Sequence, residues 1–174
     1  MLPKRNEIKT ERLLLRPFLA SDEKTACSIF TDPLVSKTYM FPDFKDEEQV
    51  KDLFRRFQKA SENPDAFVYA AALDGELIGF TNYVTKDETS TEIGYVIRSD
   101  CWNKGYATEI LKAAIAELFR IGYQKVVCGH FEENPASGRV MQKAGMLKTD
   151  RTETIAYRGV DHLVIVYEIE KSTR

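Results

Sequence analysis

The stretch from Thr91 to Phe119 reads TEIGYVIRSDCWNKGYATEILKAAIAELF, and the arrangement of the rest of the chain depends on it. Its first part, Thr91–Ile97, is rich in β-branched and aromatic residues and predicts a strand. From residue 107 onward, apolar residues recur with the spacing of one helix face. These residues are Ala107, Ile110, Leu111, Ala114, Ile115, Leu118 and Phe119. A strand, a glycine-containing loop and an amphipathic helix therefore follow one another.

The loop, Trp102–Glu109, reads WNKGYATE. The start of a helix offers unpaired backbone N–H groups and the positive end of the helix dipole. Gly105 lets the backbone approach a ligand closely, and Ala107 leaves the next turn unobstructed. Consecutive N–H groups can form an anion-binding nest, so the loop predicts a site for a pyrophosphate. The residues of this site are Asn103, Lys104, Gly105, Tyr106, Ala107 and Thr108. An ordinary turn before a helix is the alternative interpretation.

Turn and capping residues on either side of this strand–loop–helix unit mark the limits of the other predicted elements. An Asp74-Gly75 pair between two apolar runs indicates a β-hairpin. Asn134-Pro135 marks a helix start, and Gly145 marks its end. Predicted strands are Glu11–Phe18, Phe67–Leu73, Leu77–Val84, Thr91–Ile97, Lys125–Phe131, 148–156 and 162–169. Predicted helices run from Ser21-Asp22 to about Phe30, from Asp46 to about Ala60, from Ala107 to Phe119 and from Asn134 to Gly145. The pattern predicts a mixed α/β (α+β) domain, mainly antiparallel in its first half.

Composition narrows the functional classes. The chain has 174 residues, which suits one domain spanning residues 1–174. Its net charge of −2 carries no basic surplus, so we expect no nucleic-acid partner. No apolar run approaches the roughly 20 residues that span a bilayer, and the first residues lack a secretory pattern. We therefore expect a cytoplasmic protein without a membrane partner. Three cysteines and two histidines show no metal-ligand spacing, so we expect no metal.

The loop and three other motifs resemble the GNAT superfamily of N-acetyltransferases. The superfamily's phosphate signature is Gln/Arg-x-x-Gly-x-Gly/Ala, and Trp102–Ala107 matches it except that tryptophan replaces the first residue. The other motifs are Thr10–Arg16 (TERLLLR), Glu92–Tyr95 (EIGY), and Asn134–Ser137 (NPAS) with Lys143-Ala144-Gly145. Together they cover nearly the whole chain. The WxKGYATE string is similar to the branch of ribosomal-protein N-terminal acetyltransferases, RimJ, RimL and their relatives.

The resemblance implies a seven-stranded sheet whose fourth and fifth strands splay apart, with acetyl-CoA as cosubstrate between them. Mapped onto this chain, these strands are Thr91–Ile97 and Lys125–Phe131. The backbone of Tyr95, Val96 and Ile97 would pair with the pantetheine arm of the cosubstrate. Asn134 would also reach this arm, although a helix N-cap explains an asparagine there equally well.

Acetyl transfer to an amine needs a base for the amine and a hydrogen-bond donor for the departing thiolate. Glu92 lies on the strand face opposite Ile93 and Tyr95, toward the splayed opening, and its position is similar to that of the base in several GNAT enzymes. Glu132, Glu133 or water are alternative bases. Many GNAT enzymes carry a tyrosine acid seven residues after the asparagine, where this chain has Met141.

Ser137 is the candidate partner of the thiolate, since Asn-x-x-Ser is similar to the pattern of RimL-like enzymes. The alternative is that its hydroxyl only satisfies a backbone N–H at the helix start. Cys128 and His130 share one strand face but have no third partner for nucleophilic catalysis, so a structural role is favoured for them.

The resemblance places the acceptor groove between residues 32–48 and 152–162. Candidate substrate-binding residues are Tyr39, Phe41, Asp43 and Tyr157. Aromatic rings beside carboxylates suit a cationic amine, either a protein N-terminus or a small molecule. A module that binds CoA or acyl-CoA without catalysis is the alternative function, and a non-enzymatic interaction protein is a third. We expect a monomer or homodimer, while the sequence does not identify the acceptor.

Overall fold

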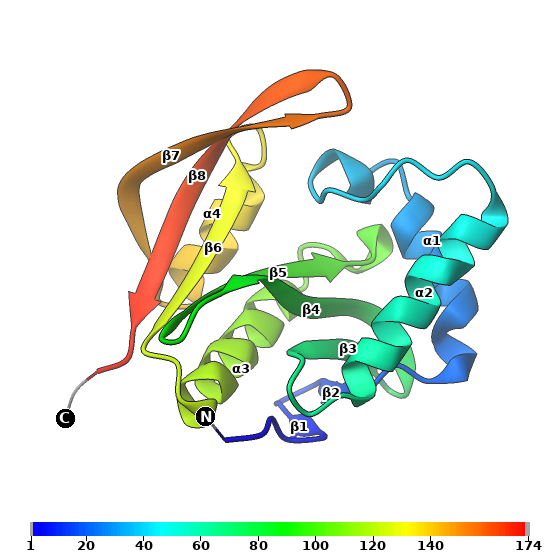
Figure 1. Ribbon diagram of the computed structural model, residues 1–174, viewed down its shortest axis with the longest axis horizontal. Helices are drawn as coiled ribbons and strands as arrows, with labels where there is room; N and C mark the ends of the chain where they lie inside the picture. The colour runs from blue at the N-terminus through cyan, green and yellow to red at the C-terminus, as the bar shows by residue number, and fades with distance from the viewer. Residues whose placement is uncertain (1, 173–174) are drawn as a thin grey trace.

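The computed structural model describes residues 2–172, which form a mixed eight-stranded sheet between two layers of helices (Figure 1). The strand order across the sheet is β1-β2-β3-β4-β5-β6-β8-β7. The strands are β1 (Ile8–Lys9), β2 (Leu14–Arg16), β3 (Val68–Leu73), β4 (Glu76–Lys86), β5 (Ser90–Ile97), β6 (Lys125–Phe131), β7 (Leu147–Tyr157) and β8 (Val160–Glu170). Every neighbouring pair is antiparallel except β5 with β6.

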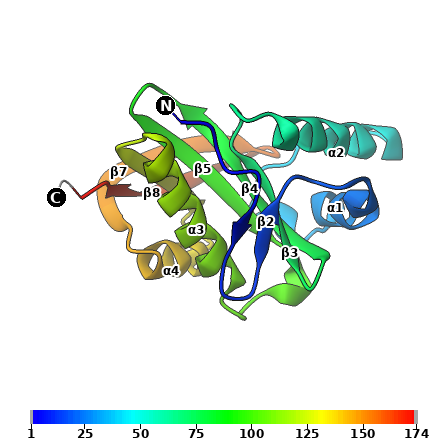
Figure 2. The same cartoon turned by 90° about the horizontal axis from the view of Figure 1, so that it is seen from below.

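The helices divide between the two faces of the sheet (Figure 2). The α-helices are α1 (Glu23–Thr31), α2 (Glu47–Glu62), α3 (Tyr106–Ile121) and α4 (Pro135–Lys143), and the short 3₁₀ turns are η1 (Ala20–Asp22), η2 (Val35–Lys37) and η3 (Ser99–Cys101). Helices α1 and α2 pack with an aromatic cluster on one face, which includes Phe30, Phe54 and Phe80. Helices α3 and α4 pack on the other face. No described helix is long and apolar enough to cross a membrane.

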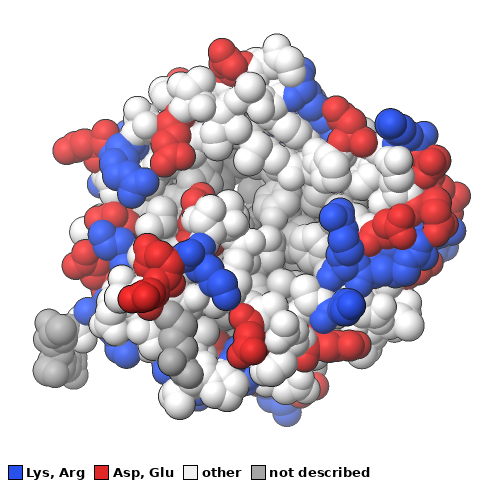
Figure 3. Space-filling view, in the orientation of Figure 1, with Lys and Arg blue, Asp and Glu red and all other residues white. Residues whose placement is uncertain are grey.

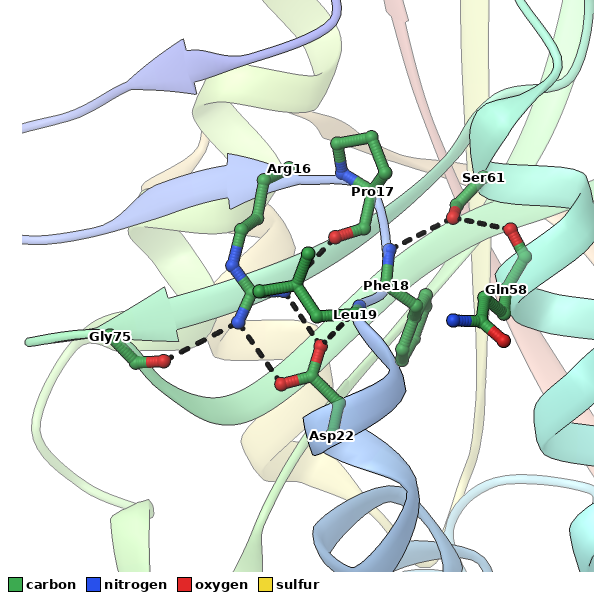
Figure 4. A network of polar contacts seen from close by, with 8 residues as sticks. All are labelled: Arg16, Pro17, Phe18, Leu19, Asp22, Gln58, Ser61 and Gly75. Atoms are coloured by element: carbon green, nitrogen blue, oxygen red, sulfur yellow. Dashed lines mark hydrogen bonds and ion pairs between the residues drawn. The ribbon is translucent and has the colours of Figure 1, made fainter.

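A buried polar network joins β2 to the α1–α2 layer (Figure 4). The Arg16 guanidinium donates to both carboxylate oxygens of Asp22, at 2.7 and 3.0 Å. Both side chains are buried, so each charge depends on the other for compensation. Next to this pair, the Ser61 hydroxyl of α2 accepts a hydrogen bond from the Phe18 N–H at 2.9 Å. These contacts fix the first helical layer against the edge of the sheet.

The sheet parts between β5 and β6. The two strands pair only over Ser90–Glu92 and Lys125–Val127. Beyond that point, β6 continues to pair along its whole length with β8, from Lys125↔Glu170 to Phe131↔Val164. Meanwhile β5 remains paired with β4 as far as Ile97. The strands β6, β8 and β7 therefore leave the plane of the first five strands as a unit.

The predicted fold class is confirmed, with differences at the sheet edges. The sheet has eight strands where seven were expected. The segment predicted as the first strand, Glu11–Phe18, contributes only β2, Leu14–Arg16. The additional strand is β1, Ile8–Lys9, which pairs with Leu15 and Leu14 as a short hairpin. Residues 11 and 12 form a bend shortly before Leu14, so the predicted strand begins three residues later than expected. The strand Lys125–Phe131 agrees residue for residue with the expectation.

Candidate functional site

A cavity of about 260 Å³ lies where β5 and β6 part. It is lined by Thr38, Tyr39, Met40, Asn82, Val84, Glu92, Ile93, Gly94, Tyr95, Gly129, His130, Phe131, Ser137, Ile155 and Val164. The lining comes from both faces of the sheet, because the gap between the strands connects them. Figure 3 shows that this side of the molecule is hollowed near its middle, with uncharged residues around the hollow and charged residues mainly toward the periphery.

Past Glu92, one edge of β5 has no strand partner. The strand pairs with β4 on its other edge from Ile93 to Ile97. An edge strand of this kind presents backbone N–H and C=O groups that can pair with an extended ligand. The predicted cofactor residues Tyr95, Val96 and Ile97 lie on this free edge, and Tyr95 also lines the cavity.

The loop that leads from β5 to α3 holds a run of free backbone donors. Among the described residues, none of the N–H groups from Asn103 to Thr108 donates to a protein acceptor. The first donor with a partner is the Glu109 N–H, which bonds the Gly105 carbonyl at 3.1 Å. Asn103 and Gly105 have φ values of +60° and +83°, a conformation that turns successive N–H groups toward one side. The free N–H groups that were predicted to hold an anion thus lie at the N-terminus of a 16-residue helix.

The N-terminal hairpin holds this loop in place, a contact that the sequence analysis missed. Arg12 donates to the Lys104 carbonyl at 2.8 Å and pairs with the Glu109 carboxylate at 2.7 Å. Its guanidinium also lies over the Tyr106 ring. Glu109 in turn accepts a hydrogen bond from the Thr10 hydroxyl. The Thr10–Arg16 motif thus has a structural role, because Thr10 and Arg12 hold the loop and the first turn of α3 in place.

Trp102 closes the other end of the loop. Its indole N–H donates to the Ile97 carbonyl at 2.7 Å, at the last residue of β5. The side chain remains 38% exposed, so it is a surface residue fastened to the strand rather than a core residue. The tryptophan that departs from the expected signature thus fixes the junction between strand and loop.

Glu92 lies half-buried in the cavity on the α1–α2 side of the sheet. Its carboxylate accepts a weak hydrogen bond from the Thr85 hydroxyl at 3.4 Å. Burial raises the pKa of Glu92, and the negative charge of Glu153 raises it further. The alternative bases, Glu132 and Glu133, are exposed outside the cavity, and Glu133 contacts His162 at 3.3 Å. A carboxyl group with a raised pKa in a cleft is suited to accept a proton near neutral pH.

Ser137 lies across the cavity from Glu92, on the first turn of α4. The helix cap is supplied by Asn134, whose side chain accepts from the Ser137 N–H at 3.3 Å. The Ser137 hydroxyl is therefore not needed as a cap and instead lies 2.7 Å from the Tyr95 hydroxyl. The side chain of Tyr95, predicted only as a backbone contact, thus reaches α4 from β5. Period-two alternation places Tyr95 on this face but cannot show which helix residue it meets.

The Cys128–His130 pair has no nucleophilic arrangement. Cys128 is completely buried, and burial raises the pKa of its thiol. His130 lines the cavity, and its Nδ1 donates to the Phe131 carbonyl at 2.7 Å. The other ring nitrogen faces Gly138, where a Cβ atom would lie only 2.7 Å away. The absence of a side chain at Gly138 thus makes room for the imidazole.

The two expected acceptor segments meet over the cavity. Tyr157, near the tip of the β7–β8 hairpin, donates to the Phe41 carbonyl at 3.2 Å. The neighbouring Arg158 contacts Ser36 and pairs with Asp43, both at 3.1 Å. Arg158 was not predicted as a site residue, because an isolated arginine at a hairpin tip carries no signal in the sequence.

The four predicted acceptor residues differ in their surroundings. The Tyr39 ring lies against Gly94 in the cavity, and its hydroxyl donates to Asn82 at 2.8 Å. Burial raises the pKa of Tyr39 to about 12, so the phenol is neutral at physiological pH. The Phe41 side chain is 3% exposed and packs in the aromatic core, so only its backbone reaches the bridge between the segments. The Asp43 side chain is exposed to solvent.

Comparison with known proteins points to one family. A family model described as "Acetyltransferase (GNAT) domain" matches residues 12–147. The uncharacterized N-acetyltransferase YnaD of Bacillus subtilis (strain 168) is 30% identical over 141 residues, covering 80% of this chain and 81% of that protein. A GNAT-family acetyltransferase structure from Bacillus anthracis is 26% identical, with a TM-score of 0.80 over 94% of this chain and 98% of the other.

The RimL ribosomal L7/L12 α-N-protein acetyltransferase, solved in complex with coenzyme A, has the same fold. Its TM-score is 0.82 at 16% identity, over 94% of this chain and 97% of the other.

Among the described residues, no group of three or more histidine, cysteine or acidic side chains could hold a metal ion.

Proposed function

This chain belongs to the GNAT acetyltransferase family, and on that premise we propose that it transfers the acetyl group of acetyl-CoA to a primary amine by direct attack on the thioester. The amine is carried by a protein N-terminus or a small molecule. The observation that carries the proposal is the continuity of two sets of backbone groups: the free edge of β5 leads directly to the unpaired N–H groups of Asn103–Thr108.

The residues present fit the cosubstrate. An extended pantetheine arm suits the free edge of Tyr95–Ile97, and a pyrophosphate suits the nest at the start of α3. Gly105, with its positive φ, leaves the nest open, and Arg12 braces it from behind. Acetyl-CoA supplies an activated acetyl thioester when bound. Lys104, Tyr106, Ala107 and Thr108 contribute main-chain donors, while Asn134 organises the first turn of α4.

The two proton-handling roles fall to residues on opposite sides of the cavity. Glu92 takes a proton from the incoming ammonium group, directly or through one water, so that the nitrogen becomes nucleophilic. Ser137, on the opposite side, offers a hydroxyl donor to the sulfur as negative charge develops there. Acetyl-CoA binding without transfer is the alternative function.

Replacing Gly105 with valine should abolish tight acetyl-CoA binding. The φ value of +83° is costly for a β-branched residue, and a Cβ atom would lie 3.3 Å from the Arg12 guanidinium. We expect the affinity measured by calorimetry to fall more than about tenfold, or about 1.4 kcal/mol. Gly75→Val is the matched control, since Gly75 has a φ of +88° in a hairpin turn outside the cavity. Equal losses in both variants, or none in either, would mean that the loop is not the cofactor site.

The acetyl transfer itself is tested with a panel of free-amine peptides, polyamines and aminoglycosides, incubated with acetyl-CoA and analysed by mass spectrometry. We expect one class to be acetylated, with a rate that rises as pH increases through the raised pKa of Glu92. Glu92→Gln should lose this rising limb and be slower by about 100-fold below the pKa of the amine. As the pH approaches the pKa of the amine, the rates of the wild type and of Glu92→Gln should converge, because a neutral amine needs no base.

Glu133→Gln is the control for this experiment, because Glu133 is an exposed carboxylate outside the cavity. A rising limb that persists in Glu92→Gln and disappears in Glu133→Gln would transfer the role of base to Glu133. Acetyl-CoA binding with no acetylation of any class would favour the binding module.

The acceptor groove lies, we propose, beneath the bridge between Phe41, Asp43 and Tyr157, with Tyr39 forming its floor. Tyr157→Phe removes the hydrogen bond to the Phe41 carbonyl, and Asp43→Asn removes the ion pair with Arg158. Tyr157→Phe should change the acceptor KM by about threefold or more, because a neutral hydrogen bond contributes roughly 1 kcal/mol. Asp43→Asn should change it by about twofold, because solvent screens an exposed ion pair. The acetyl-CoA affinity of each variant should change by a smaller factor than its acceptor KM. Unchanged acceptor kinetics in both variants would place the groove elsewhere.

A further inference from the structure

The Ser137 hydroxyl lies in a hydrogen-bonding arrangement that its place in the helix does not require. A serine on the first turn of a helix commonly uses its oxygen to satisfy a backbone N–H. Here the Ser137 N–H is already bonded to the Asn134 carbonyl and side-chain oxygens, at 3.1 and 3.3 Å. The Ser137 hydroxyl is thus available, half-buried, at the wall of the cavity.

The partner of this hydroxyl comes from a different layer of the protein. The Tyr95 side chain projects from β5 toward α4, and its hydroxyl has two acceptors on Ser137. It donates to the Ser137 carbonyl oxygen at 3.1 Å, and it lies 2.7 Å from Ser137 Oγ, where either hydroxyl can donate. The shorter contact joins the two hydroxyls. A serine hydroxyl has one proton and two lone pairs, so when it accepts the phenol's proton its own proton is free to point elsewhere.

Helix α4 offers no phenol of its own at the next turns. The residue seven positions after Asn134 is Met141, which is 1% exposed and packs in the core under α3 and α4. A thioether cannot donate a proton. Among the described residues that line the cavity on the α4 side, Tyr95 thus supplies the phenol, and the strand that carries it also forms the free edge.

We propose that Tyr95 is a positioning residue that donates its phenolic hydrogen to Ser137 Oγ and so directs the serine hydroxyl into the cavity, toward the sulfur of the cosubstrate. This inference rests on the proposed function, because it takes the thioester sulfur to lie at the parting of β5 and β6. The phenol does not touch the sulfur; it acts through Ser137. A hydroxyl that already accepts one hydrogen bond is a stronger donor in the next.

The surroundings keep the phenol in its donating form. Burial raises the pKa of Tyr95, so the hydroxyl retains its proton through the neutral range. The neighbouring titratable groups include Cys128, whose thiol pKa is also raised by burial, and His130, whose Nδ1 donates to the Phe131 carbonyl. A third is Tyr167, whose hydroxyl accepts from the Gln142 side chain at 3.4 Å. None of these groups is hydrogen-bonded to the Ser137 hydroxyl, so Tyr95 is its side-chain partner among the described residues.

The pKa of the thiol of bound CoA tests this inference without any amine acceptor. Thiolate formation is followed by its ultraviolet absorbance as pH rises, with desulfo-CoA as the blank, in the wild type and in Ser137→Ala, Tyr95→Phe and the double variant. A hydroxyl directed at the sulfur stabilises the thiolate and lowers its pKa. We expect Ser137→Ala to raise the thiol pKa by about one unit, the size expected for loss of a charge-assisted hydrogen bond.

Tyr95→Phe should raise the thiol pKa by about half as much, and the double variant should match Ser137→Ala alone, because Tyr95 acts only through Ser137. Tyr123→Phe, which removes a buried phenol outside the cavity, should leave the thiol pKa unchanged. Thermal unfolding of each variant checks that the fold is retained, since removing one phenol oxygen leaves the ring in place.

Three results would overturn the inference. An unchanged thiol pKa in Tyr95→Phe, with CoA still bound by calorimetry, would show that the phenol does not direct Ser137. Additive shifts in the double variant would show that Tyr95 acts independently of Ser137. Failure of the wild type to bind CoA at all would overturn the proposed function together with this inference, so the two failures are distinguishable.

Discussion

Strands β5 and β6 share hydrogen bonds only over Ser90–Glu92 and Lys125–Val127, and the rest of the site depends on this short pairing. If the strands paired along their full length, β5 would have no free backbone edge and the cavity would be closed. The parting is maintained because each strand has a better partner on its other side: β4 for β5 and β8 for β6. The opening is thus a consequence of sheet topology, and it does not depend on a single side chain.

The parting also determines which side chains can meet. Alternate residues of β5 face opposite layers, so Glu92 faces the α1–α2 side while Tyr95 faces α4. A ligand in the gap can therefore be approached from both faces of the sheet at once. The free edge of β5 runs on into the loop before α3, which Arg12 and Trp102 fasten at its two ends. Under the proposed function, backbone groups would bind the part of the ligand that does not vary, and side chains from the other layer would select the acceptor.

Sequence patterns predicted those features that depend on local spacing. The limits of β6 and the cap of α4 at Asn134 follow from turn residues, apolar periodicity and capping preferences, and the structure agrees with both. The helix expected from Ala107 begins one residue earlier, at Tyr106. Placing Glu92 toward the opening needed only the alternation of a strand and the resemblance to a family.

The contacts that sequence patterns could not predict join segments far apart in the chain. Arg12 meets Lys104, Tyr95 meets Ser137 and Tyr157 meets Phe41 only after the layers have packed. The side chain of Phe41 also shows the limit of composition arguments: an aromatic residue in a loop suggested a substrate contact, but burial in the α1–α2 core accounts for the ring. The first strand was predicted too long because an apolar run does not reveal where the ladder ends.

The central claim is that the free edge of β5 and the donors before α3 form one continuous binding surface for acetyl-CoA. Amide-resolved hydrogen exchange, with and without CoA, tests it most directly. Exchange should slow together at Asn103–Thr108 and at those N–H groups of Ile93–Ile97 that face the gap, because both acquire hydrogen-bond acceptors on binding. A second hollow, of about 150 Å³, is lined in part by Lys4 and Tyr123, and amides around it should not change. Protection at that hollow, with unaltered exchange in the loop and along β5, would contradict the account.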